Sequence, residues 1–373
     1  MRVVISPDSF KGTATAAQAA TALARGWKSV RPHDELQLLP MADGGEGTLD
    51  AFEMAVAGSI RMPVSVQGPD NRPVTSHWVL LPAGGSGSSG GGTGVVELAS
   101  TSGITLLDPL LPLDAHTLGF GQAITAALDH GVDRLLLAIG GSSSSDGGVG
   151  ALTALGARFL DHAKRPIRLG NRGLGTLARV DLSQLRPIPP GGASILSDVT
   201  NPLLGARGAA AVFGEQKGAS AEQREGLESG LARLARLISA GPISVGPETP
   251  GAGAAGGTGF GLLAWGATMA PGAEAVGQAL GVPDAVAAAQ LVITGEGRFD
   301  QQTADGKVPS YVRGLAQRAG TQLCLVAGSI QAEPVGFAQA VDLSKLAGSA
   351  TAAMSETVRW LEAAGARLAR GAE

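Results

Sequence analysis

The sequence predicts an α/β protein of two domains, and three observations lead to this prediction. At 373 residues the chain exceeds the length at which one hydrophobic core usually stops growing. Apolar residues make up 44% and charged residues 16%, with 57 glycines, which is typical of an Ala/Gly-rich α/β enzyme. Strand-like and helix-like segments alternate at both ends of the chain, which indicates βαβ units and a parallel sheet.

The first sixty residues show this alternation most simply. We expect strands at 3–6 and 35–39 and helices at 15–30 and 48–56. Ligands of parallel sheets normally collect beyond the carboxyl ends of the strands. Residues 7–12 and the motif ADGGEGT at 42–48 occupy two such ends.

The middle of the chain is richer in strand signals. We expect strands at 60–66, 74–81, 95–98, 134–139 and 194–197, and helices at 120–129 and 221–240. Residues 84–94 are almost wholly Gly and Ser, and we interpret them as a flexible connection between two strands.

Beyond residue 285 the simple alternation returns, with strands expected at 291–294 and 322–327 and helices at 308–319 and 350–368. We therefore predict a discontinuous domain formed by 1–70 and 286–373, with a second α/β domain, 71–285, inserted into it.

Composition excludes several classes of partner. The net charge is −4 and aromatic residues make up only 3%, which leaves no basic stripe or stacking platform for nucleic acid. No apolar run reaches the roughly 18 residues of a membrane span, and no signal peptide is visible. The single cysteine, Cys324, has no partner within the chain for a disulfide. We expect a cytoplasmic protein.

Four short acidic motifs stand out, and we interpret each as a turn. They are ADGGEGT at 42–48, SSDGGVG at 144–150, SDVTNP at 197–202 and TGEGRFD at 294–300. Glycine lets backbone N–H groups approach an anion, but a carboxylate in the same turn repels phosphate unless a divalent cation lies between them. The combination predicts phosphate chemistry with Mg²⁺.

Each motif has a structural alternative. Gly251–Gly256 fits a dinucleotide fingerprint by spacing, but Pro250 stands where a strand should end; a phosphate-binding backbone loop and close helix packing explain the run equally well. Asp146 could hold a cation or cap the next helix. Residues 197–202 could be a turn without chemistry, and the charges of 294–307 could pair on the surface.

Two standard kinds of site are excluded. Gly306-Lys307 lacks the glycine of a P-loop, and the histidines lack metal-ligand spacing.

Six segments in a fixed order carry a family resemblance. They are ISPDSFKGTATAAQAA, PMADGGEGT, GGSSSSDGGVGALTALG, SDVTNPLLGARGAAAVFGEQKGA, GAGAAGG and VITGEGRFDQQTADGK, beginning at residues 5, 40, 140, 197, 251 and 292. With these segments the chain resembles the bacterial type I glycerate kinases over essentially its full length. The resemblance implies ATP-dependent, Mg²⁺-dependent phosphorylation of D-glycerate. It also implies a Rossmann-like domain built from both chain ends, an inserted α/β domain and an active site in the cleft between them.

The chain departs from this family at 113–115, 117–121 and 143–145 and in a Gly/Ser insertion near residue 88. Leu113-Asp114-Ala115 replaces an Arg-Asn-Pro sequence, which removes an arginine from that loop. Ser143-Ser144-Ser145 replaces Ala-Thr-Asn.

From the residue types in these segments we predict which residues are catalytic and which bind glycerate, nucleotide and Mg²⁺. The expected catalytic residues are Asp198, Asp43 and Lys11, with Asp198 favoured over Asp43 as the base. Those expected to bind glycerate are Asp8, Ser9, Lys11, Asn201 and Arg298. Those expected to bind nucleotide are Gly141, Ser142, Ser143, Gly253, Gly256, Gly257 and Lys307. The expected Mg²⁺ ligands are Asp43, Asp198 and Glu296.

Three points stay open at this level. The resemblance favours 2-phosphoglycerate as product, but 3-phosphoglycerate requires only a small rotation of the substrate. The alternative functions are an NAD-dependent hydroxyacid oxidoreductase and a non-catalytic nucleotide-binding or metabolite-binding protein. The protein is expected to be a monomer or a homodimer.

Overall fold

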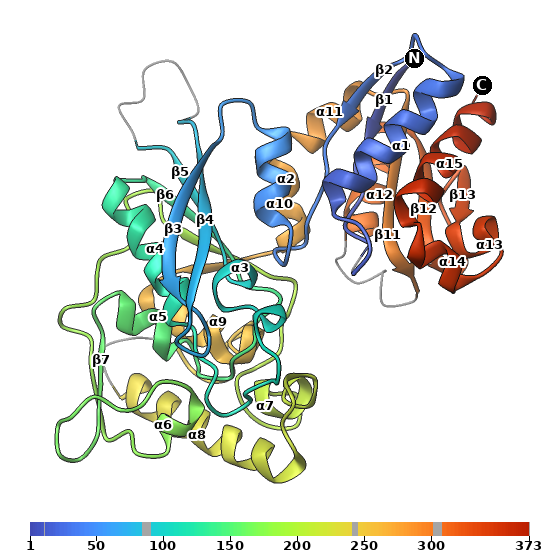
Figure 1. Ribbon diagram of the computed structural model, residues 1–373. Helices are drawn as coiled ribbons and strands as arrows, with labels where there is room; N and C mark the ends of the chain where they lie inside the picture. The colour runs from blue at the N-terminus through green and yellow to red at the C-terminus, as the bar shows by residue number, and fades with distance from the viewer. Residues whose placement is uncertain (11, 84–90, 241–244, 301–307, 373) are drawn as a thin grey trace. The chain divides into compact units, whose positions relative to one another are not determined.

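The computed structural model describes residues 1–10, 12–83, 91–240, 245–300 and 308–372 (Figure 1). Lys11, Lys307 and most of the Gly/Ser-rich segment lie outside the described residues. The chain forms two compact units. The first unit comprises Met1–Asp43, Asp50–Ala57 and Pro271–Glu373, and the second comprises Gly44–Leu49 and Gly58–Ala270.

The first unit contains a five-stranded parallel sheet built from both ends of the chain. Its strand order is β13-β12-β11-β1-β2. These strands are β13 (Gln339–Asp342), β12 (Gln322–Ile330), β11 (Leu291–Phe299), β1 (Arg2–Ile5) and β2 (Glu35–Leu38). Val3 of β1 pairs with Leu291 on one side and Leu36 on the other, so the two chain ends share one hydrogen-bonded sheet.

Helices of the first unit flank this sheet, except that α2 and α10 lie farther from its strands (Figure 1). They are α1 (Ala16–Val30), α2 (Thr48–Ala55), α10 (Gly272–Ala279), α11 (Val282–Ala288), α12 (Val308–Ala319), α13 (Leu343–Ala347), α14 (Ala350–Ser355) and α15 (Thr357–Arg370). Helix α1 begins at a capping box in which Thr15 and Gln18 satisfy each other's backbone N–H groups. Its apolar side packs with α15 over buried residues of β1, β11 and β12.

Glycine brings α1 and α15 into backbone contact. A Cβ atom at position 365 would lie 2.2 Å from the carbonyl oxygen of Leu23, and one at position 26 would lie 1.9 Å from that of Glu362. Only glycine allows this approach.

The second unit contains a six-stranded mixed sheet of order β10-β9-β6-β5-β4-β3. Its strands are β3 (Ile60–Gln67), β4 (Pro73–Leu81), β5 (Thr93–Glu97), β6 (Arg134–Ala138), β9 (Ala193–Leu196) and β10 (Thr268–Ala270). Strands β3 to β5 pair antiparallel, whereas β5, β6, β9 and β10 run parallel. The structure thus confirms the predicted α/β class.

Helices and two short strands complete the second unit. They are α3 (Ala99–Ser102), η1 (Ile104–Leu106), α4 (Leu118–His130), α5 (Val149–Ala154), β7 (Arg158–Leu160), α6 (Asn171–Leu174), β8 (Arg179–Asp181), α7 (Ala209–Phe213), η2 (Glu215–Lys217), α8 (Ala221–Ser239) and α9 (Ala254–Trp265). Buried residues of β6, β9, α4 and α9, such as Leu135, Ile195, Phe120 and Phe260, share one core. None of the described helices is both long and apolar enough to cross a membrane.

Local structure differs from the prediction in three places. The segment TGEGRF is strand rather than turn: β11 runs to Phe299, and Glu296 pairs with Ala327. Gly295 and Gly297 resemble turn residues in sequence, but Gly295 here lets the backbone of Val326 approach closely, and Gly328 on β12 does the same for the carbonyl of Gly297. The helix expected at 350–368 is two helices, because Glu356 leaves helical geometry at φ −131°. Strand β3 pairs with β4 in the second unit, although the expected boundary at residue 70 grouped it with the chain ends.

Gly365→Ala tests the contact between α1 and α15. The added methyl group would collide with the Leu23 carbonyl, and overpacking of this kind costs about 1–3 kcal/mol. We expect the free energy of unfolding in urea to fall by that amount. Gly314→Ala on α12 is the matched control, because there the nearest atom is an Arg318 nitrogen at 3.4 Å. Equal stability of the two variants would contradict the packing described above.

Candidate active site

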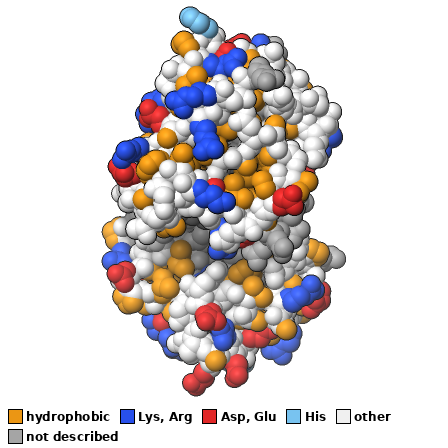
Figure 2. Space-filling model, turned by 90° about the vertical axis from the view of Figure 1, so that its right-hand side faces the viewer, with side chains coloured by type: hydrophobic (Ala, Val, Ile, Leu, Met, Phe, Trp, Pro, Cys, Tyr) orange, Lys and Arg blue, Asp and Glu red, His pale blue; other side chains and the backbone are white. Residues whose placement is uncertain are grey.

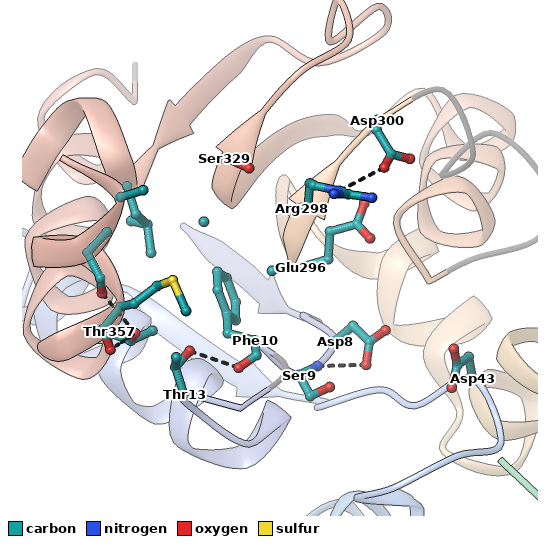
Figure 3. Close-up of a pocket in the computed structure, with 16 residues that line it drawn as sticks. Asp8, Ser9, Phe10, Thr13, Asp43, Glu296, Arg298, Asp300, Ser329 and Thr357 are labelled. Carbon is teal, nitrogen blue, oxygen red and sulfur yellow. Dashed lines mark hydrogen bonds and ion pairs between the residues drawn. The ribbon is translucent and has the colours of Figure 1, made fainter. Parts of the chain in front are cut away.

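A pocket of about 370 Å³ opens in the first unit at the carboxyl ends of β1, β11 and β12 (Figure 3). Its polar residues are Asp8, Ser9, Thr13, Asp43, Glu296, Arg298, Asp300, Ser329 and Thr357. This is the edge of a parallel sheet at which ligands normally bind. Five residues expected to bind substrate or metal therefore meet in one pocket: Asp8, Ser9, Asp43, Glu296 and Arg298.

Backbone pairing beyond β1 positions Asp8 and Ser9. The N–H groups of Ser6 and Asp8 donate to the carbonyl oxygens of Ile293 and Gly295 at 2.7 and 2.8 Å, so the chain follows β11 past the end of the strand. The Ser9 N–H donates to Asp8 Oδ1 at 2.6 Å. Asp8 is 7% exposed, so its carboxylate is held at the wall of the pocket.

Strand geometry places Glu296 and Arg298 together. They are two residues apart on β11, so their side chains lie on the same face of the sheet. Glu296 is 6% exposed, whereas the side chain of Arg298 is 61% exposed. Arg298 Nε donates to Asp300 Oδ2 at 2.9 Å (Figure 3).

Asp43 reaches the pocket from the chain that follows β2. The N–H groups of Leu39 and Met41 donate to Ile5 and Pro7 at 2.9 and 2.8 Å and extend the pairing with β1. Among the described residues no group of three or more His, Cys, Asp and Glu side chains is close enough to hold a metal ion. A cation in this pocket would therefore need ligands from substrate or water as well.

The rest of the pocket is apolar. Phe10, Leu343, Ala350, Ala353 and Met354 line it, the last four from α13 and α14. The hydroxyl groups of Thr13 and Thr357 donate to backbone carbonyls of Phe10 and Ala353, both at 2.8 Å. The pocket thus combines a charged part with an apolar part.

A second pocket, of about 330 Å³, lies in the second unit beyond the ends of β6 and β9. Gly141 and Ser142, both expected to bind nucleotide, line it together with Ser197, Val199 and Lys217. Ser143 is 2% exposed and donates through its hydroxyl to the Ser102 carbonyl at 2.8 Å. Of the serines expected to bind nucleotide, Ser142 therefore contacts this pocket directly.

The glycines at the start of α9 are closely packed. A Cβ atom at position 253 would lie 2.2 Å from the Pro202 carbonyl oxygen, and one at position 256 would lie 2.0 Å from that of Ser144. Gly256 and Gly257 have φ of 66° and 85°, which glycine adopts without strain. This close packing was the structural alternative for the run, and a role of these glycines in nucleotide binding stays a prediction.

Asp146 has a structural role in the turn before α5. It is fully buried and accepts hydrogen bonds from the Thr117 N–H and hydroxyl, both at 2.9 Å, and from the N–H groups of Gly148 and Gly150, both at 3.1 Å. These donors satisfy the carboxylate without a metal ion. Asp146 therefore accepts from N–H groups at the start of α5, as the structural alternative expected, although the N-cap residue of this helix is Gly148.

Lys217 is the residue that sequence reasoning missed. It is 2% exposed, and its Nζ donates to Ser142 Oγ at 2.8 Å and to the Ser144 carbonyl at 2.5 Å. Burial lowers the pKa of Lys217 to about 7, although the charge of Asp146 acts in the opposite direction. A lysine following Glu215 and Gln216 looks like a surface residue, and the only sequence signal was its place in a segment that carries the family resemblance.

Asp198 and Asn201 lie in the second unit. Ser197 and Val199, on either side of Asp198, line the second pocket. The Asn201 side-chain amide donates to the Arg207 carbonyl at 2.8 Å. The residues expected to bind glycerate are therefore divided, with Asn201 in one unit and Asp8, Ser9 and Arg298 in the other.

Acidic and basic side chains are interspersed on the face of the molecule drawn in Figure 2.

Comparisons with known proteins show the family to which the chain belongs. The glycerate kinase family matches residues 3–373. A glycerate kinase of Halalkalibacterium halodurans is 41% identical over 332 residues, covering 88% of this chain and 85% of that protein. A glycerate 2-kinase of Escherichia coli is 38% identical over 334 residues, covering 88% and 86%. A solved structure of glycerate kinase 2 from Salmonella typhimurium LT2 superposes with a TM-score of 0.84 at 36% identity, covering 100% of this chain and 98% of that one. The chain therefore belongs to the glycerate kinase family, whose enzymes transfer a phosphoryl group to an alcohol.

Proposed function

We propose that the protein transfers the γ-phosphoryl group of ATP to D-glycerate, with Mg²⁺, and forms 2-phosphoglycerate. The observation that carries this proposal is the pocket of the first unit, where Asp8, Ser9, Glu296 and Arg298 meet at the carboxyl edge of a parallel sheet. A small hydroxy acid needs such a combination of hydroxyl, carboxylate and guanidinium groups.

Glycerate is proposed to bind at the charged part of this pocket. The Arg298 guanidinium is largely exposed and can offer parallel N–H donors to the substrate carboxylate. Asp8 and Ser9 can hydrogen-bond the hydroxyl groups of the substrate. Lys11, which lies outside the described residues, is proposed to add a positive charge there.

Mg²⁺ fits the donors that this pocket supplies. Asp43 and Glu296 offer carboxylate oxygens, the ligands that Mg²⁺ prefers, and sites of this kind use one or two carboxylates together with phosphate oxygens and water. The ion would offset the repulsion between these carboxylates and a phosphoryl group.

The second unit is proposed to bind the phosphate groups of ATP. Gly141 and Ser142 offer a backbone amide and a hydroxyl group in the second pocket. An active site between the two domains stays a prediction. The oxidoreductase alternative loses support, because Gly251–Gly253 form a turn and none of the described residues directly before it, 245–250, is in a strand.

In the transfer step the glycerate hydroxyl oxygen attacks the γ-phosphorus. The new O–P bond forms, the bond to the ADP oxygen breaks, and the hydroxyl proton passes to a carboxylate. We propose Asp198 as that base, because it stands between Ser197 and Val199 at the second pocket, and Asp43 as the alternative.

A coupled assay of ADP release tests the proposed reaction. With D-glycerate, ATP and Mg²⁺ we expect turnover of about 1–100 per second, which EDTA abolishes and excess Mg²⁺ restores. Analysis of the product should show 2-phosphoglycerate. Reduction of NAD with glycerate, in the absence of ADP release, would contradict the proposal.

Asp198→Asn tests the base. The amide cannot accept the hydroxyl proton, so we expect kcat to fall ~10²-fold with little change in the KM for either substrate. Asp284→Asn, at an exposed position in the first turn of α11, is the matched control. A variant with wild-type kcat would remove Asp198 from this role, and the same substitution at Asp43 would then be measured.

Glu296→Gln tests the proposed metal site. The substitution keeps the size of the side chain on β11 but removes its charge, so we expect the Mg²⁺ concentration for half-maximal activity to rise about tenfold. Glu333→Gln, at an exposed position, should leave this concentration unchanged. An unaltered Mg²⁺ requirement in Glu296→Gln would show that the ion binds elsewhere.

A further inference from the structure

The second pocket contains a buried cation that the proposed mechanism does not yet use. Lys217 is 2% exposed, yet it lines a pocket of about 330 Å³. Burying an ammonium group is costly unless something of opposite charge or good hydrogen-bonding capacity compensates for it. A lysine kept at such a position needs an explanation beyond packing.

Protein acceptors bind only two of the three N–H groups that the charged side chain of Lys217 can offer. Its Nζ has three N–H donors, and two meet acceptors at Ser142 Oγ and the Ser144 carbonyl. Both acceptors are neutral. Within the described residues no salt bridge of Lys217 is found.

The charged groups around Lys217 do not neutralise it directly. Asp146 is near enough to act on it electrostatically, but its carboxylate is occupied by Thr117, Gly148 and Gly150. Glu215, on the same short helix η2, pairs with Arg224 at 2.9 Å. The segment of α9 packed against Lys217 carries no titratable side chain, and Asp198 stands between two residues that line the pocket.

The neighbours of Lys217 are suited to an anion. Ser142 can donate its hydroxyl proton to an oxyanion while it accepts from Lys217. Gly141 lines the pocket with its backbone, at a φ of 72° that glycine adopts without strain. Ile104, Ile139 and Phe213 form apolar walls, and their low polarity strengthens a charge–charge interaction.

We propose that Lys217 and Ser142 form an oxyanion-binding subsite that holds a charged group of a substrate. The inference rests on the proposed function for the identity of that group, which is either the phosphate chain of ATP or the carboxylate of glycerate. Gly141 and Ser142 were expected to bind nucleotide, so the phosphate chain is the assignment to test first.

If Lys217 had only a structural role, its substitution would have different effects. If Lys217 only joined η2 to the turn at Ser142 and Ser144, its loss would reduce stability and leave the affinity for anions unchanged. If the subsite exists, the affinity for one substrate falls selectively. The lowered pKa of Lys217 adds a second difference, because an anion would stabilise the charged form and bring a proton with it.

Calorimetric titration of the full-length wild-type, Lys217→Met and Lys217→Arg proteins separates these roles. The probes are ADP with Mg²⁺, inorganic tripolyphosphate and D-glycerate, each titrated alone. We expect Lys217→Met to weaken binding of ADP and tripolyphosphate at least tenfold and to leave binding of D-glycerate within twofold. Lys164→Met, at an exposed position, is the matched control and should bind like the wild type.

Proton uptake provides a test that does not depend on the folding of Lys217→Met. With a pKa of about 7, Lys217 is mostly neutral at pH 8, so anion binding should take up close to one proton. Titrations of ADP at pH 8 in two buffers of different ionisation enthalpy measure this uptake. Lys217→Arg carries its charge at every pH and should show none.

The outcomes are distinct. Selective loss of D-glycerate affinity would support the subsite and assign it to the carboxylate. Unchanged affinity for all three probes in folded Lys217→Met would overturn the proposal. Equal proton uptake by wild type and Lys217→Arg, measured with the probe whose affinity Lys217→Met loses, would overturn it as well. Because these are binding measurements, a wild type that binds the probes but lacks glycerate kinase activity would refute the proposed function and leave the subsite standing.

Discussion

Repulsion between like charges is the constraint on which the account of this protein depends. Asp8, Asp43 and Glu296 line one pocket, and the substrates proposed for this protein are a carboxylate and a triphosphate. Two like unit charges 4 Å apart repel by about 4 kcal/mol at an effective dielectric constant of 20. Several such pairs would prevent binding unless positive charge were supplied. In the first unit that charge comes from Arg298, with Mg²⁺ and Lys11 proposed to add to it.

In the second unit, hydrogen-bond donors and a buried lysine stand where the first unit has an exposed arginine. The Asp146 carboxylate is enclosed by hydrogen-bond donors and holds the turn before α5, so it is a structural anion rather than a metal ligand. Lys217 is a buried amino group with a pKa lowered to about 7, and a bound anion would favour its charged form. The closely packed glycines at the start of α9 allow this turn and Lys217 to approach each other, because Gly256 lies against both Ser144 and Lys217. Gly256 is therefore needed for the close packing that positions the amino group of Lys217.

The sequence predicted the α/β class and most elements of the parallel sheet, because buried strands such as 3–6 and 134–139 are short apolar runs with clear ends. It placed Asp8, Asp43 and Glu296 near strand ends, where a pocket is observed. It failed where local and tertiary preferences compete: Glu296 lies in a strand although glycines flank it, because sheet pairing overrides the local preference. It missed Lys217, because nothing local indicates that a lysine beside Glu215 is buried by a turn some seventy residues earlier in the chain.

Diffraction at the manganese absorption edge, from crystals grown with Mn²⁺, ADP and D-glycerate, tests the central claim most directly. Mn²⁺ takes the same oxygen ligands as Mg²⁺ and can be located by its anomalous signal. The account predicts a peak at about 2.1 Å from a carboxylate oxygen of Asp43 or Glu296. Bound ligands with no metal near either carboxylate would show that the negative charges of this pocket are balanced in some other way.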